Sequence, residues 1–570
     1  MIKRQSLLLI SVFLLSVTAN AQSFRVEDIK DRVGKGKPFK LSGGFSANST
    51  LNGGNGVSGR DPFVYYLNGN INLNVYGLVN LPFSFNLTNS GSSYKLPSNP
   101  NRLSIHPSYK WITGHIGDVS MAFSPYTLNG HMFTGAGVEL NPDGWVFAAM
   151  YGRLLKAVEY DEVRPAFLPT YKRMSYGMKA GKTGEKYMIS INVINVKDDI
   201  SSLTTPPDSL GITPMENLAG SISLLYKPVR FIEVSGEYGL SLLTNDRRLA
   251  KDDRDGMIGS WAGSNVSSSY YKAFKAQLNY VGQTNRLGVG YERIDPNYRT
   301  LGAYYFTNDI ENITLNAYQS LWENKLNVSV SIGIEKDDLA KNKASASSRT
   351  VGSLNITATP SDRINVNLLY TNFQTYTNVR SNFELINQEN QLDKLDTLNF
   401  VQLSQSANLN LNIITKKTDT QLHNLNINAS YQDAANKQGG IYRPGSVTEM
   451  INAATAYSWT FLKSGLSLNG ALNINNSKIL NGNTITWGPT IGTSSRLFKK
   501  KVMLSGSFSY NTGYLEKIKQ NEVILCRINS AYTPVQRHNI TLAYNYQFRS
   551  AMNRPATNTS LLTVGYSFSF

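Results

Sequence analysis

The chain ends in the eight residues Thr563-Val564-Gly565-Tyr566-Ser567-Phe568-Ser569-Phe570. Successive side chains of an extended strand point to opposite faces, so this segment has two faces of different chemistry. One face carries Leu562, Val564, Tyr566, Phe568 and Phe570, and the other carries Thr563, Gly565, Ser567 and Ser569. A strand with one oily face and one small polar face suits a wall that has lipid on one side and water on the other.

The same terminal segment matches a known pattern. It resembles the closing-strand signal of bacterial outer-membrane β-barrels, which reads polar-x-Gly-x-x-aromatic-x-aromatic. The marked positions are Thr563, Gly565, Phe568 and Phe570. The resemblance implies that the barrel assembly machinery recognises this end of the chain.

The opposite end of the chain has the pattern of a secretory signal. Lys3 and Arg4 form a positive start, residues 7–17 form an apolar core, and Ala19-Asn20-Ala21 matches an A-x-A cleavage site. The apolar run of about 11 residues is too short for a spanning helix, which needs roughly 20. The sequence therefore predicts a signal peptide at 1–21 and export of the mature chain.

The composition fits an exported all-β protein. Of the 570 residues only 17% are charged, while Tyr (32), Phe (23) and Gly (45) are plentiful. The formal charge of +17 is spread over the segments between predicted strands and is not gathered in a recognition motif, which argues against nucleic-acid binding. We expect the basic residues to face outer-membrane lipid and lipopolysaccharide instead. The single cysteine, Cys526, excludes an intramolecular disulfide framework.

Strict alternation of apolar and polar residues recurs from about Pro38 to Phe570. Examples are the segments 67–75, 326–334, 401–413, 425–431 and 540–548. Such a period-2 pattern places the apolar and the polar set on opposite faces of a sheet. Counting hairpins predicts an all-β fold, a transmembrane antiparallel β-barrel of about 26 strands (range roughly 22–28), as a single unit over 38–570.

Short turns and longer polar stretches alternate along the chain. The longer stretches are 50–60, 91–102, 154–171, 198–215, 244–265, 296–307, 376–396 and 433–447. Transmembrane barrels have short periplasmic turns and long extracellular loops, whereas the alternative fold, a soluble β-sandwich array or propeller, has no reason to keep long loops at every second connection. An even strand number places both termini on the periplasmic side, with 22–37 as a short periplasmic segment.

A barrel of this size needs something to fill its lumen, because barrel diameter grows with strand number. The best candidate within the chain lies between Leu103 and Leu155, a region that holds His106, His115 and His131. Within it we expect 124–133 to fold inward as a constriction or to form a partner contact. The residues involved are Pro125, Tyr126, Asn129, His131 and Phe133. The alternative is an ordinary turn at a bend of the chain.

The sequence favours no catalytic or metal site. His115 and Asp118 are close in the chain, but a regular strand places them on opposite faces, which makes a poor catalytic dyad. The run 251–256 hints at a calcium loop through Asp253 and Asp255, but it lacks the later bidentate glutamate. We therefore expect a protein that is not an enzyme and that needs no cofactor.

Several segments resemble those of large outer-membrane β-barrel proteins from bacteria of the Bacteroides/Flavobacterium type. The turn phrases are 226–231 and 497–501, and the segments 125–131 and 135–140 are similar to features of a functionally uncharacterised family there. The chain departs from TonB-dependent receptors because its sequence shows no N-terminal plug domain and no clear energy-coupling box. The resemblance implies a barrel and carries no known reaction.

Two functions stay open on the sequence. The first is an outer-membrane pore or translocation channel for polar solutes or a polypeptide, gated by inward loops or by an exported or periplasmic partner protein. An inward face rich in Asn, Ser, Thr and Gln favours it, because such a lining is hydrated without a strong field. The second is a non-conducting surface or assembly platform that binds an exported protein or a polysaccharide through its external loops.

Overall fold

The computed structural model describes most of the chain from Pro38 onward. The described residues are 38–56, 61–90, 100–160, 168–205, 207–251, 264–304, 307–336, 339–340, 348–372, 403–435, 437–438, 441–442, 448–479 and 482–570. The predicted signal peptide (1–21) and the predicted periplasmic segment (22–37) lie outside them, and so does the candidate calcium loop through Asp253 and Asp255.

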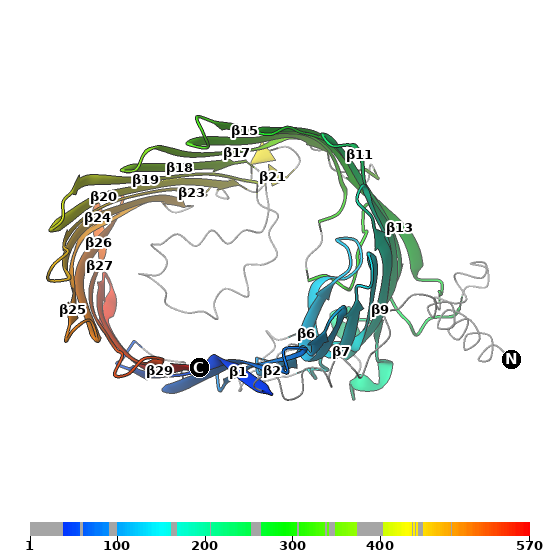
Figure 1. The fold of residues 1–570 in the computed structure, drawn as a ribbon, viewed down its shortest axis with the longest axis horizontal. Coiled ribbons are helices and arrows are strands. Elements are labelled where there is room, and N and C mark those ends of the chain that lie inside the picture. The colour runs from blue at the N-terminus through cyan, green and yellow to red at the C-terminus, as the bar shows by residue number, and fades with distance from the viewer. Residues whose placement is uncertain are drawn as a thin grey trace.

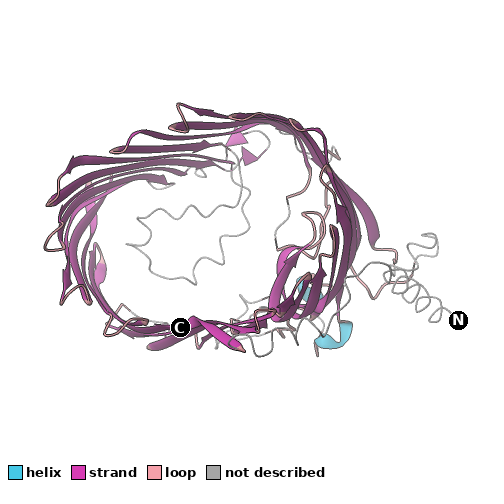
Figure 2. Cartoon of the chain, in the orientation of Figure 1, coloured by secondary structure: helices cyan, strands magenta, loops and turns pink. Residues whose placement is uncertain are grey.

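The described chain folds almost entirely into β-strands (Figure 2). In chain order they are β1 (Phe39–Gly53), β2 (Phe63–Val75), β3 (Val79–Thr88), β4 (Arg102–Ile105), β5 (Ser108–Tyr109), β6 (Ile112–Ala122), β7 (Asn129–Leu140), β8 (Trp145–Leu155), β9 (Arg173–Thr183), β10 (Tyr187–Asp198), β11 (Glu216–Val229), β12 (Ile232–Thr244), β13 (Ser268–Val281), β14 (Asn285–Ile294), β15 (Ile310–Leu321), β16 (Leu326–Lys336), β17 (Ser348–Ser361), β18 (Ile364–Thr371), β19 (Leu403–Lys417), β20 (Gln421–Ala435), β21 (Lys437–Gln438), β22 (Ile441–Tyr442), β23 (Thr448–Phe461), β24 (Leu466–Ile479), β25 (Gly482–Leu497), β26 (Val502–Leu515), β27 (Ile518–Tyr532), β28 (His538–Ala551) and β29 (Arg554–Ser569). Two 3-10 turns, η2 (Ile200–Ser202) and η3 (Asp208–Leu210), interrupt them. No helix in the described part of the chain has the length and apolar character needed to cross a membrane.

All of these strands except β21 and β22 form one antiparallel sheet that closes on itself (Figure 1). β21 and β22 pair with each other as a separate two-stranded sheet, and β20 pairs with β23. Consecutive strands pair, and β1 also pairs with β29, from Gly44 opposite Ser569 to Gly53 opposite Ser560. The sheet has 27 strands, of which β4 and β5 share one position between β3 and β6, which leaves 26 positions in the wall. The predicted transmembrane antiparallel barrel of about 26 strands is confirmed.

The two faces of the wall differ as the alternation predicts. On β10, Ile189 and Ile191 are exposed on the outer face, whereas Ser190 and Asn192 are buried on the inner face. Opposite orientations follow from the period of the strand, because neighbouring side chains point to opposite sides. An apolar outer face and a polar inner face are the arrangement that separates lipid from a hydrated lumen.

The two rims of the barrel carry connections of different length. One rim has only short turns, and the described ends of the barrel strands, Phe39 and Ser569, lie at this rim. The other rim carries the long connections, but only up to β23. Beyond it, two residues join β24 to β25, β26 to β27 and β28 to β29. The last of the longer polar stretches in the sequence, 433–447, coincides with this change.

The seam between the first and last strands is built from the predicted assembly segment. Phe570 and Gly43 exchange two backbone hydrogen bonds: the N–H of Phe570 donates to the oxygen of Gly43 over 2.9 Å, and the reverse bond is 3.0 Å. The ring of Phe568 lies 6.0 Å from the ring of Phe45, and the hydroxyl oxygens of Thr50 and Thr563 are 3.2 Å apart. Recognition of this segment by the assembly machinery stays a prediction.

Closure of the seam can be tested by cross-linking. In a Cys526→Ser background, we expect Ser46→Cys and Ser567→Cys to form a disulfide on oxidation, because the two residues are direct cross-strand partners. The closed chain should migrate faster than the reduced chain in a denaturing gel.

The matched control pairs Ser46→Cys with Asn539→Cys, a residue that faces Ser567 on β28 and therefore lies two strands away from Ser46. Two strand spacings amount to roughly 9–10 Å, which a disulfide does not span. A sheet that stays open between β1 and β29 would give no cross-link in either pair.

Candidate functional site

The hairpin of β6 and β7 leaves the wall of the barrel part-way along its length. Pairing of β6 with the preceding strands stops at Gly117, and pairing of β7 with β8 stops at Thr134. The two strands continue to pair with each other from Asp118 opposite Thr134 to Ala122 opposite Asn129. Residues 118–133, the inward hairpin, therefore lie inside the lumen, where Figure 1 shows them beside the inner face of the wall.

Glycines allow the hairpin to bend out of the wall. Gly117 has φ 102°, and a Cβ built on it would lie 2.1 Å from the oxygen of Leu103. A Cβ on Gly135 would lie 2.2 Å from the oxygen of Tyr151 on the adjacent strand. Any larger residue at either position would push against backbone, which cannot move aside as the end of a flexible side chain can.

Asp118 ties the bend together. Its Oδ2 accepts a hydrogen bond from the backbone N–H of Leu103 over 3.1 Å, and its Oδ1 accepts one from the hydroxyl of Thr134 over 2.6 Å. The carboxylate thus satisfies a backbone donor where strand pairing ends. His115 instead contacts His106, with 2.9 Å between their Nδ1 atoms, so the two candidate dyad residues serve separate contacts.

The inward hairpin packs against the wall through an apolar core inside the lumen. Val119, Met121, Phe123, Leu128 and Phe133 are buried in this core together with residues of the wall. The wall contributes Ala148, Met150, Leu154, Ile194, Val196, Ala219 and Leu243. Full burial of one such large side chain stabilises by about 1.5–3 kcal/mol, so the packing holds the hairpin firmly in place.

A second segment packs against both the hairpin tip and the wall. Residues 295–304, the strap, belong to the connection between β14 and β15. The hydroxyl of Tyr298 donates to the oxygen of Tyr126 over 2.8 Å, and the hydroxyl of Thr300 donates to the oxygen of Thr127 over 2.7 Å. Leu301 joins the apolar core, and its N–H donates to Oδ1 of Asn217 on the wall over 3.1 Å. The strap therefore holds the tip against β11.

The five predicted constriction residues divide into two groups. Tyr126, His131 and Phe133 are buried, whereas Pro125 and Asn129 are exposed. The buried His131 ring stacks on Tyr304 of the strap at 3.9 Å between ring centroids, and Nδ1 of His131 donates to the oxygen of Met132 over 2.7 Å. The N–H of Asn129 donates to the oxygen of Gly302 over 3.1 Å. All five lie on the inward hairpin.

The sequence did not single out the strap. The sequence of 296–307 shows no strict alternation, and it is counted among the longer polar stretches. The available signal was its large apolar and aromatic side chains, among them Tyr298, Leu301 and Tyr304. Tyr298 and Leu301 are almost fully buried in the structure.

Charged side chains of the wall also contact the hairpin. Nζ of Lys179 donates to the oxygen of Phe123 over 2.9 Å, and the hydroxyl of Tyr126 donates to Oε1 of Glu292 over 2.9 Å. Oε2 of Glu292 lies 3.6 Å from Nζ of Lys275. Lys179 is therefore engaged with the hairpin and Lys275 with Glu292.

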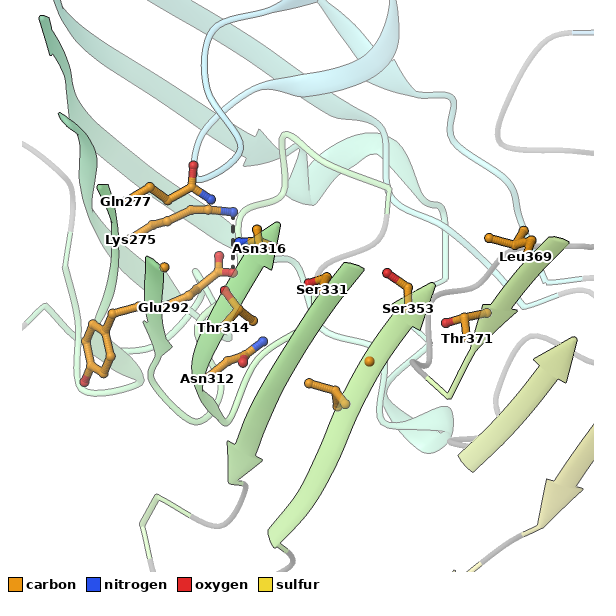
Figure 3. A pocket seen from close by; sticks show the side chains of 14 residues that line it. Lys275, Gln277, Glu292, Asn312, Thr314, Asn316, Ser331, Ser353, Leu369 and Thr371 are labelled. Atoms are coloured by element: carbon orange, nitrogen blue, oxygen red, sulfur yellow. Dashed lines mark ion pairs between the residues drawn. The ribbon is translucent and has the colours of Figure 1, made fainter. Parts of the chain in front are cut away.

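A groove of about 440 Å³ begins at this ion pair and crosses the inner face of β13 to β18 (Figure 3). Its lining is dominated by amide and hydroxyl side chains from consecutive strands. They include Gln277, Asn312, Thr314, Asn316, Ser331 and Thr371, and Ser353 lies between the last two. Among the described residues no three ligand-type side chains come together as a metal site requires.

Comparison with known proteins found similarity at the level of solved structures alone. No protein-family model matches the sequence, and no curated protein matches it. The FrpB iron transporter from Neisseria meningitidis (F5-1 variant) is similar with a TM-score of 0.38 and 11% identity, over 95% of this chain and 84% of that one. The translocation pore of the P pilus usher PapC has a TM-score of 0.38 and 11% identity, over 93% of this chain and 99% of that one. The copper transporter OprC has the same TM-score and identity, over 93% and 81%.

The bend of the hairpin gives a direct test of its packing. We expect Gly135→Val to lower stability by about 1–3 kcal/mol, because the new side chain overlaps the backbone of Tyr151. The temperature at which the detergent-solubilised barrel loses its compact gel mobility measures this change.

Gly470→Val is the matched control, since a Cβ at Gly470 on β24 meets no atom within 4 Å. It should leave that temperature close to that of the unmodified protein. Equal behaviour of the two variants would contradict a tightly packed bend.

Proposed function

We propose that this chain forms an outer-membrane pore for polar solutes in which the inward hairpin narrows the passage. The observation that carries the proposal is the division of the lumen into two sides. The hairpin and the strap cover the inner face of β8 to β14, where apolar side chains form a core. The pore is the function that such a partly filled, water-lined barrel supports best.

The other side of the lumen supports passage of hydrated solutes. The inner face of β18 to β20 carries rows of asparagines that pair across strands: Asn365 with Asn412, Asn367 with Asn410, and Asn410 with Asn428. The amide of Asn367 donates to the hydroxyl of Thr357 over 3.1 Å. Neutral amides offer both donors and acceptors to water and to solutes without holding ions by charge.

The hairpin acts in this proposal as a fixed constriction. Its tip is held by the strap through the bonds of Tyr298 and Thr300, and by the wall through the bond from Lys179 to Phe123. A segment held by several buried contacts opens at a free-energy cost that approaches that of unfolding the region. Selection therefore rests on the size of the remaining passage.

Conductance across a planar bilayer tests the pore. We expect the purified full chain to insert with stepwise conductance. A variant in which a short Gly-Ser linker replaces 119–132 should give larger steps, because that segment no longer occupies the lumen. The quantity to measure is the ratio of the conductance step of the variant to that of the full chain.

Ile491→Ala, a change on the exposed outer face of β25, is the control and should leave the step size unchanged. Absence of stepwise conductance in a sample that shows compact gel mobility would contradict the pore. Copurification of a second protein with such a silent barrel would favour the platform instead.

A further inference from the structure

The groove beside Glu292 has the chemistry of a binding site. Its lining combines amides, each with donors and an acceptor, and hydroxyls, each of which donates and accepts. In Figure 3 Asn312, Thr314 and Asn316 project together from β15, next to Ser331 and Ser353 of the following strands. A volume of about 440 Å³ lies within the range of roughly 300–1,000 Å³ typical of small-molecule pockets.

Asn312 is a groove residue with an unpaired acceptor. The residue is only 9% exposed, yet its Oδ1 has no hydrogen-bond partner among the described residues. A buried acceptor without a partner costs about 1–3 kcal/mol. Asn312 is one of the residues that line the groove.

The groove is close to neutral and offers little apolar surface. Its charged side chains, Lys275 and Glu292, form one ion pair with 3.6 Å between Nζ and Oε2. The apolar side chains of the lining are Val351 and Leu369, apart from the ring of Tyr291. The charged groups of an anionic ligand, or the apolar surface of a strongly apolar one, would therefore lack matching side chains in the groove.

Two glycines deepen the groove. A Cβ on Gly290 would lie 2.8 Å from the hydroxyl oxygen of Thr314, and one on Gly352 would lie 3.3 Å from the oxygen of Ser331. Because these positions carry no side chain, a ligand can approach the backbone of β14 and β17 closely.

We propose that this groove binds a short stretch of a neutral oligosaccharide, a ligand class that deepens the proposed pore function and rests on it. Sugar hydroxyls both donate and accept hydrogen bonds, as the amides and hydroxyls of the groove do. A polypeptide would place charged and apolar side chains against a lining that has few partners for them. The groove thus favours the glycan over the peptide.

The position of the groove relates such a ligand to the constriction. Oε1 of Glu292 accepts the hydroxyl hydrogen of Tyr126 at the hairpin tip, and the same carboxylate ends the groove. A sugar bound here lies beside the tip of the inward hairpin. The groove therefore contacts solutes that pass through the lumen and favours some of them over others. It is not a site on the outer surface of the barrel.

Calorimetry on the full chain in a detergent without sugar headgroups tests the ligand. We expect saturable binding of maltohexaose, weakened roughly tenfold by Asn312→Leu and by the milder Ser353→Val, because each change removes hydrogen bonds from the groove. Asn428→Leu, on the amide rows outside the groove, should bind as the unmodified chain does. Compact gel mobility of each variant shows that it is folded.

Three results would overturn the inference: no saturable heat with maltohexaose, tighter binding of a (Gly-Ser)3 peptide, or tighter binding of an anionic hexasaccharide. Equal weakening by Asn428→Leu would also count against the groove. Conductance of the same sample separates the two proposals. A conducting barrel without sugar binding refutes the ligand alone, and a silent barrel that binds the sugar refutes the pore alone.

Discussion

The whole structure depends on the need to satisfy backbone hydrogen bonds where lipid offers none. A strand edge left open in hydrocarbon costs several kcal/mol for each unpaired group, so the sheet must meet itself. The ladder between β1 and β29 meets that need, with Phe570 and Gly43 exchanging bonds at its end. The apolar outer face and the polar lumen follow, because closure fixes which side each residue faces.

The inward hairpin interrupts the pairing of β6 with β4 and of β7 with β8, and the protein compensates locally. Asp118 accepts a hydrogen bond from the N–H of Leu103 at the point where β6 no longer pairs with β4. Gly117 and Gly135 provide the space for the chain to turn away. The hairpin then recovers free energy by burying Leu128 and Phe133 inside the lumen. A barrel wall thus acquires a small globular core on its inner side.

The sequence predicts the features that recur in every strand, and it does not predict the contacts that occur once in the structure. Alternation predicts the barrel and its strand number because every strand obeys the same period. The placement of Tyr126 and Phe133 inside the lumen could be suggested from prolines, glycines and histidines in 124–133, but their partners could not. The strap residues Tyr298 and Leu301 contact the hairpin across long sequence distances, and nothing local encodes that contact.

The tight turns that join the last strands bear on the order of folding. Glu516 and Lys517 adopt positive φ angles of 48° and 71°, so these two residues alone form the turn from β26 to β27. Closing so short a loop costs little chain entropy, whereas the seam joins Thr50 to Thr563, 513 residues apart. Strands β24 to β29 can therefore pair with one another through local contacts. Pairing of β1 with β29 needs all the strands between them in place, so it is the last step.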